Sequence, residues 1–140
     1  MGTKEKFAGL ESGATLFEVA EHLDRDALVR YAGAGGDFNA IHYNEAHAKS
    51  VGLPNVIAHG MLTMGLAAAA LENWLGDPTA VTALGVRFSA MVPVPFPEGN
   101  DVTVVGRLGS VEGDTARVEL DVTSAGNAVL SKSFADVTLA

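Results

Sequence analysis

The sequence has no cysteine and few basic residues. Without cysteine the protein can form no disulfide bond and has no thiol for catalysis. We expect a cytoplasmic location. Only 9 Lys and Arg stand against 17 Asp and Glu, which gives a net charge of −8. Because binding to nucleic-acid phosphates needs clustered Lys and Arg, this balance argues against a nucleic-acid partner.

Long apolar segments are also missing. The longest apolar run covers residues 60–71, whereas a membrane-spanning helix needs about 20 apolar residues. The N-terminal residues lack the apolar stretch of a signal peptide. We therefore expect no membrane insertion. The length of 140 residues suits a single domain over residues 1–140.

Aromatic residues are scarce at 6%, although hydrophobic residues make up 48% of the chain. The core is therefore expected to be aliphatic and rich in alanine. Charged residues reach only 19%, which is low for a chain whose whole surface meets water. We expect another subunit to cover part of this surface.

The first half of the chain carries strand and helix signals in turn. Residues 14–20 are predicted to form a strand. Asp24 is a suitable N-cap for a helix over 25–34, which a run of glycines then ends. Asn44 can cap a second, short helix that stops at Gly52.

The second half begins with the longest predicted helix, residues 57–75, which is apolar on nearly every side and must be buried on most of them. The period then changes to two, which predicts four strands in a meander: residues 81–91, 101–111, 115–123 and 128–139. Gly126-Asn127 is a tight hairpin signal. An α+β hot-dog fold is expected, in which an antiparallel sheet wraps a central apolar helix.

The first candidate for chemistry is the stretch from Asp37 to His42, which follows three glycines. A bent loop easily brings two side chains five residues apart to one point, since the extended span is about 15 Å at most. A carboxylate beside an imidazole can act as an acid–base pair, and Asn39 can anchor the loop. The alternative is structural: an Asx turn in which Asp37 caps the loop and His42 is exposed or hydrogen-bonded within it.

The second candidate is His59-Gly60, at the start of the apolar helix. A helix N-terminus presents unpaired N–H groups, and a glycine there lets a carbonyl oxygen approach them. The alternatives are that Gly60 only permits close packing and that His59 is a hydrogen-bonded buried histidine.

Other site chemistries have little support. The four histidines (His22, His42, His47 and His59) include no helical pair with metal-ligand spacing, so we expect no metal site. No serine has a nucleophile-elbow context, and no glycine pattern for nucleotide phosphates is found. Arg87 is interpreted as a solvated strand residue, with a buried ion pair or a phosphate contact as alternatives.

The segment that runs from Tyr31 through Asp37-Phe-Asn-Ala-Ile-His42 to Ala48 resembles the hydratase-2 motif of MaoC-like (R)-specific enoyl-thioester hydratases. Three further segments fit the same family: Ala58–Gly65, Val86–Phe88 and Pro93–Pro95. Together they are most similar to the B subunits of mycobacterial-type (3R)-hydroxyacyl-carrier-protein dehydratases. Ala40 stands where the motif usually has proline, and Ala34 where a larger aliphatic residue or glycine is usual. Neither departure removes a reactive side chain.

This resemblance implies a carbon–oxygen hydro-lyase that reversibly adds water, in the syn sense, to trans-2-enoyl thioesters in fatty-acid metabolism. Asp37 and His42 would hold and activate the water, Asn39 would position the loop, and the Gly60 N–H would stabilise the thioester oxygen. No cofactor is implied, because the thioester already acidifies C2. The implied partners are an acyl thioester of coenzyme A or acyl carrier protein, and a second hot-dog subunit in a homodimer or heterodimer.

Two other functions stay open at this stage. A hot-dog acyl-thioesterase would direct water at the thioester carbonyl with the same Asp37, His42 and helix N-terminus. A non-catalytic acyl-binding subunit of a heterodimeric dehydratase would need none of these side chains. Acyl chain length, the choice between coenzyme A and carrier protein, and the direction of the reaction are not determined by these patterns.

Overall fold

Short helices and long strands surround one long helix. The computed structural model describes residues 1–140. The α-helices are α1 (Thr3–Phe7), α2 (Arg25–Gly35), α3 (Glu45–Ser50) and α4 (Gly60–Leu75), and the 3-10 helices are η1 (Ala40–His42) and η2 (Pro78–Ala80). The strands are β1 (Thr15–Leu23), β2 (Val81–Phe88), β3 (Asn100–Glu112), β4 (Thr115–Ser124) and β5 (Asn127–Thr138).

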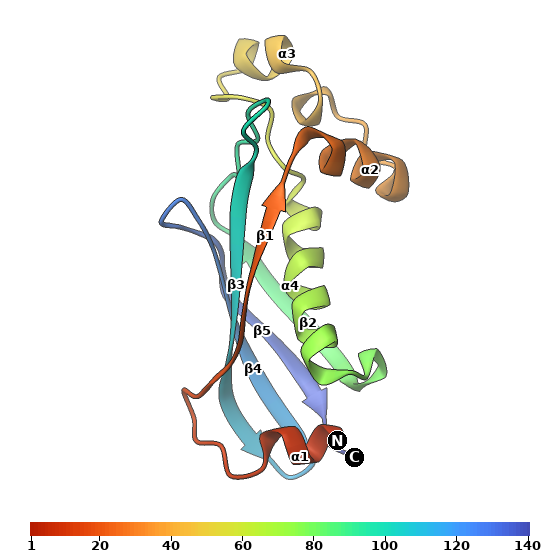
Figure 1. Cartoon of the computed structure of the whole chain (residues 1–140), viewed down its shortest axis with the longest axis vertical. Coiled ribbons are helices and arrows are strands. Elements are labelled where there is room, and N and C mark those ends of the chain that lie inside the picture. Colours follow the sequence, from red (N-terminus) through yellow and green to blue (C-terminus); the bar gives the residue numbers. More distant parts are fainter.

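All strands form one antiparallel sheet in the order β1-β3-β4-β5-β2. The sheet curls around α4, while α2 and α3 lie beyond one end of it (Figure 1). This is the hot-dog arrangement that the sequence predicted. No helix is long and apolar enough to cross a membrane.

The predicted four-stranded meander is wrong in one respect. The strands β3, β4 and β5 do follow one another, but β2 pairs with β5 rather than with β3. The segment 89–99, which contains several prolines, carries the chain from one edge of the sheet to the opposite edge, where β3 joins β1. Alternation identifies a strand, but it does not say which strand lies beside it.

The core lies between α4 and the concave face of the sheet. Strand β4 alternates without interruption, and its inward apolar residues are at most 2% exposed: Ala116, Val118, Leu120 and Val122. Ala67 and Leu71 of α4 are fully buried in the same cluster. Burying each such leucine contributes about 1.5–3 kcal/mol, so this aliphatic packing supplies much of the stability.

One face of α4 is not covered by this chain. Met61, Gly65 and Ala69 recur every four residues along it and are exposed. The expectation that the helix is buried on most sides therefore holds except along this one stripe. An apolar helix face left open in this way is typical of a contact surface.

Several element boundaries differ from the prediction. The helix expected from residue 57 begins at Gly60, because residues 57–59 are extended and the Ala58 N–H donates to the Val92 carbonyl (2.9 Å). The caps at Asp24 and Asn44 are confirmed, since each side chain accepts a backbone N–H three residues later.

The observed ends of the strands also differ from the predicted ends by a few residues. Strand β1 continues to Leu23, and β2 stops at Phe88 instead of residue 91. The hairpin turn is Ala125-Gly126 rather than Gly126-Asn127, with positive φ angles of 48° and 78°. A two-residue turn that twists with the strands needs both φ angles positive.

The N-terminal helix α1 was not predicted. It lies against the C-terminal end of α4, where the Phe7 and Trp74 rings meet edge to face at 5.3 Å. The Lys6 ammonium donates to the Trp74 carbonyl (2.6 Å), one of the last carbonyls of α4 without a partner inside the helix. A helix of five residues depends on such contacts rather than on its own propensity.

Candidate active site

The loop after α2 is shaped by two consecutive side-chain turns. Gly36 ends the helix in the left-handed conformation, with φ of 72°. Asp37 Oδ1 then accepts the Asn39 N–H (3.1 Å), and Asn39 Oδ1 accepts the Ile41 N–H (3.2 Å). These Asx turns lead directly into η1, whose last residue is His42.

The side chains of Asp37 and His42, at the two ends of this loop, lie close together. The second carboxylate oxygen, Asp37 Oδ2, lies 3.8 Å from His42 Nε2. Both atoms are near enough to hydrogen-bond one common water molecule. The two interpretations of this segment are therefore compatible, because one carboxylate oxygen builds the Asx turn while the other faces the imidazole.

The imidazole of His42 is buried and is held by a backbone carbonyl on the side away from Asp37. Its side chain is 8% exposed, whereas that of Asp37 is 51% exposed. His42 Nδ1 lies 2.7 Å from the Ile57 carbonyl oxygen. Since a carbonyl only accepts, Nδ1 carries the hydrogen in the neutral ring, and Nε2 turns a free lone pair toward Asp37.

The ring of His59 packs against the ring of His42. The two rings are stacked, with centroids 3.7 Å apart and planes 21° apart. His59 Nε2 donates to the backbone carbonyl of Asp37 (3.1 Å), whereas the buried Nδ1 has no partner. Burial lowers the pKa of His59 below its ordinary 6.5, and the bond to Asp37 offsets only part of this shift. His59 is thus a neutral, hydrogen-bonded buried histidine that fixes the Asp37 backbone.

The same three residues are the only group with ligand atoms close enough to share a cation. One ligand atom each from Asp37, His42 and His59 lies within 4.8 Å of the others. A metal ion binds an imidazole in the plane of its ring. Because the two histidine rings are stacked nearly parallel, one ion cannot lie in both planes, and this donor geometry does not form a metal centre.

Gly60 is the first residue of α4 and leaves its N–H without an acceptor in the chain. The first backbone N–H after it with an acceptor belongs to Leu62, which donates to the His59 carbonyl (3.0 Å). A Cβ atom at Gly60 would lie 3.1 Å from the ring of Phe88. The backbone here is therefore open to a small group, and a side chain would take up that space.

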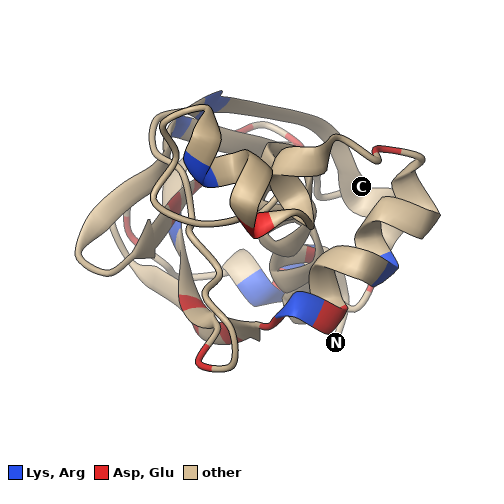
Figure 2. Cartoon of the chain, turned by 90° about the horizontal axis from the view of Figure 1, so that it is seen from above, with Lys and Arg blue, Asp and Glu red and all other residues tan.

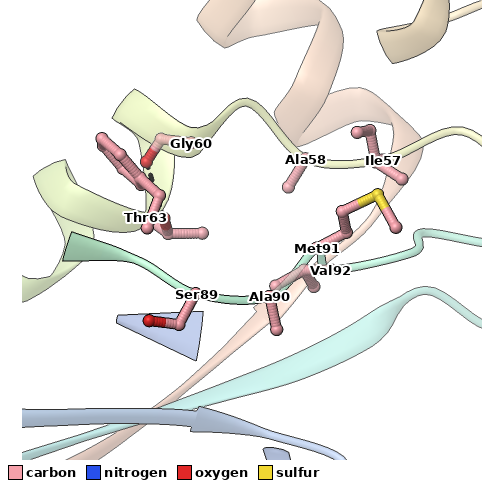
Figure 3. A pocket seen from close by; sticks show the side chains of 9 residues that line it. Ile57, Ala58, Gly60, Thr63, Ser89, Ala90, Met91 and Val92 are labelled. Atoms are coloured by element: carbon pink, nitrogen blue, oxygen red, sulfur yellow. Dashed lines mark hydrogen bonds between the residues drawn. The ribbon is translucent and has the colours of Figure 1, made fainter. Parts of the chain in front are cut away.

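A pocket of about 360 Å³ opens beside Gly60 (Figure 3). Its wall contains backbone and side chains of Ile57, Ala58 and Thr63, and it continues along residues 88–92. Asp37 and His42 do not line it. The connection runs through Ile57, which lines the pocket and whose carbonyl holds His42.

The structure brings Asp37, His42 and His59 into contact, with Asn39 forming the loop that joins them. Arg87 is exposed and its side chain forms no hydrogen bond or ion pair, which agrees with a solvated strand residue. Lys and Arg are spread over several elements instead of forming one patch (Figure 2). The sequence patterns missed the Ile57 carbonyl and the pocket segment 88–92, since a backbone acceptor leaves no sequence signal.

Comparison with known proteins shows that the chain is similar to MaoC proteins. A family model described as "MaoC like domain" matches residues 7–128. The 3-hydroxyacyl-thioester dehydratase X of Mycobacterium tuberculosis is 46% identical over 70 residues. That match covers 50% of this chain and 24% of the dehydratase.

Two solved structures extend the similarity to nearly the whole chain. A MaoC-like dehydratase superposes with a TM-score of 0.91 and 40% identity, covering 96% of this chain and 42% of that one. The R-hydratase of Pseudomonas aeruginosa gives a TM-score of 0.82 and 26% identity, covering 95% and 84%. The chain thus spans less than half the length of the two dehydratases.

Proposed function

Because the chain belongs to the MaoC-like domain family, we propose that it is a hydro-lyase that reversibly adds water to trans-2-enoyl thioesters. The product would be a (3R)-hydroxyacyl thioester, of coenzyme A or of an acyl carrier protein. The observation that carries this proposal is the pairing of Asp37 Oδ2 with His42 Nε2 at 3.8 Å, with the histidine tautomer fixed by Ile57.

In the hydration direction, Asp37 and His42 hold one water between them. The water oxygen forms a bond to C3, and its proton passes to the free lone pair of His42 Nε2. The electron pair of the C2–C3 double bond moves toward the thioester carbonyl, and C2 then takes a proton from the same Asp37–His42 pair on the same face. Positioned acid–base groups contribute about 10²–10⁴-fold.

The thioester oxygen becomes negative during this step and needs hydrogen-bond donors. The free N–H of Gly60 lies at the positive end of α4 and beside the pocket. We assign it the role of oxyanion donor, a contribution of about 2.7–4 kcal/mol when the donor is well aimed. His59 supports the site by holding the Asp37 backbone. The chemistry assigned to these residues needs no cofactor.

A second hot-dog unit is proposed to cover the open face of this chain. Strand β2 is an edge of the sheet, and the apolar stripe Met61, Gly65 and Ala69 is exposed on α4. Pairing at a free edge would continue the sheet and bury the stripe. The unit formed by residues 1–140 is proposed to be one hot-dog domain that acts in the cytoplasm, as a homodimer or beside a different hot-dog partner.

The test follows the ultraviolet absorbance of the conjugated enoyl thioester, with crotonyl-CoA and dodecenoyl-CoA as substrates. Wild-type protein should remove this absorbance and form the hydroxyacyl thioester without releasing free coenzyme A. Release of coenzyme A would instead support thioester hydrolysis. If the chain alone and the chain with its co-purified partner are inactive on both coenzyme A and carrier-protein thioesters, the hydro-lyase proposal is wrong.

A further inference from the structure

Arg25 lies outside the candidate active site but reaches the two segments that support it. It is the first residue of α2, and its side chain is 21% exposed. Its Nε donates to the Val94 carbonyl (2.5 Å), and its Nη2 donates to Asn55 Oδ1 (2.8 Å). A weaker contact joins the same Nη2 to Glu45 of α3 at 3.5 Å.

The two segments that Arg25 touches are bonded to each other. The Val94 N–H donates to the Val56 carbonyl (2.8 Å), and the Ala58 N–H donates to the Val92 carbonyl (2.9 Å). Together they form a short two-stranded ladder. The guanidinium of Arg25 lies at the end of this ladder and donates hydrogen bonds to both of its strands, at Asn55 and at Val94.

His42 is attached to the middle of the same ladder. The Ile57 N–H donates to the Ile41 carbonyl (3.1 Å), and the Ile57 carbonyl accepts from His42 Nδ1 (2.7 Å). A shift of the 55–58 segment would therefore move the acceptor that fixes the tautomer and direction of the imidazole. Arg25 is linked to that acceptor through Asn55 and its neighbours along the chain.

An arginine suits this place better than other cations. Its planar fork presents two N–H groups at once, whereas a lysine ammonium acts as one point charge. The acceptors lie among buried residues, since Val56 and Val94 are both 0% exposed. Removal of the guanidinium would leave the Val94 carbonyl without a donor in a place that water reaches poorly, and it would leave Asn55 Oδ1 with the Val56 N–H alone.

We propose that Arg25 is a positioning residue for the hydro-lyase reaction: it fixes the 55–58 and 92–94 ladder and thereby the orientation of His42. This inference rests on the proposed function, but the role of Arg25 in holding His42 is independent of the substrate. Arg25 touches no reacting atom, and it acts only through the backbone around Ile57.

The first test compares kinetics of Arg25→Met, Arg25→Lys and Arg30→Met. Arg30 is the matched control, because it lies on the same helix, carries the same charge, and has an exposed side chain that forms no hydrogen bond. We expect Arg25→Met to lower kcat by about 10- to 100-fold per folded molecule with KM changed by less than about threefold. The kcat of Arg25→Lys should lie between those of wild type and Arg25→Met. The kcat of Arg30→Met should equal that of wild type.

The second test needs no activity. The ¹⁵N chemical shifts of the neutral His42 ring report which nitrogen carries the hydrogen. Wild type and Arg30→Met should show a protonated Nδ1 and a free Nε2, whereas Arg25→Met should show both nitrogens partly protonated. His47, which is exposed, supplies an internal reference for a ring without a fixed tautomer.

These two measurements separate the possible failures. Wild-type kcat in Arg25→Met overturns the positioning role. A lower kcat with an unchanged His42 spectrum also overturns it, because the loss would then arise elsewhere. A wild type that hydrates no enoyl thioester contradicts the proposed function alone, and the His42 spectra still decide whether Arg25 holds the ring.

Discussion

The sheet β3-β4-β5 and the loop region 36–59 are built on different principles. The sheet is held by many interchangeable aliphatic contacts within one buried cluster, to which Val118 and Leu120 belong. The loop region is held by a few directed hydrogen bonds, such as His42 to Ile57 and Asn39 to Ile41. A change in the sheet should therefore cost stability, whereas a change in the loop should cost activity.

The strongest test of this contrast removes the proposed acid–base pair. Asp37→Asn and His42→Gln should each lower kcat/KM by at least about 10²-fold, because positioned acid–base groups contribute that much. Both keep nearly the same side-chain size, so the free energy of unfolding should change by no more than about 1 kcal/mol. Enoyl-thioester kinetics and urea unfolding measure the two quantities. A large loss of stability with little loss of activity would reverse the contrast.

A substitution in the sheet should give the opposite pattern. Leu120 is 2% exposed on the inner face of β4, and Leu120→Ala should lower the free energy of unfolding by about 2–5 kcal/mol through lost burial and a cavity. The activity per folded molecule should stay near wild type. Val111→Ala is the control, because Val111 is 47% exposed near the end of β3. Urea unfolding of both variants decides the point, and equal losses would contradict it.

Gly60 directly follows the loop region and lies against Phe88 of the edge strand β2. In Gly60→Ala the new methyl group presses on the exposed ring of Phe88, which can yield, so stability should change little. The methyl group and the displaced ring should nevertheless enter the pocket and lower kcat/KM by about tenfold. The double variant Gly60→Ala, Phe88→Ala should recover part of this loss. Gly33→Ala, in open space on α2, is the control and should leave kcat/KM unchanged.

The smallest expected effect is a pH dependence of stability from His59. Its pKa in the folded chain lies below the unfolded value of 6.5 because of burial, so the unfolded chain binds the proton first as the pH falls. The free energy of unfolding should therefore fall as the pH drops below 6.5, by at most about 1.4 kcal/mol per pH unit for one proton.

Urea unfolding at a series of pH values measures this effect. His59→Gln should lose the extra slope below the unfolded pKa, whereas His47→Gln, at an exposed position, should keep it. An identical slope in wild type and His59→Gln would show that another group is responsible.

The contrast also explains what could be predicted from the sequence. The alternation of Ala116, Val118 and Leu120 has a fixed period, and period two identifies a strand face without knowledge of its neighbours. The caps at Asp24 and Asn44 are local for the same reason. The position of β2 beside β5 depends on a crossover of distant residues, and no local pattern encodes it.

The candidate site also contains both kinds of feature: some are local in sequence and some depend on distant residues. Asp37, Asn39 and His42 are close in sequence, so their spacing and the family resemblance pointed to one loop. The contacts of His42 with Ile57 and His59 join positions 15 or more residues apart, and Arg25 reaches Asn55 and Val94 across still longer separations. Such contacts are visible only after the chain has folded.

The pairing of β1 with β3 has a consequence for the order of folding. Leu23 stands opposite Asn100, so this one pairing closes a loop that contains α2, the candidate site and α4. Closing so long a loop carries a large entropic cost, whereas β3, β4 and β5 join through short hairpins. During refolding the three hairpin strands should therefore associate first and β1 last. The candidate site would be enclosed only at that final step, and the proposed hydratase activity should return later than the spectroscopic signal of the sheet.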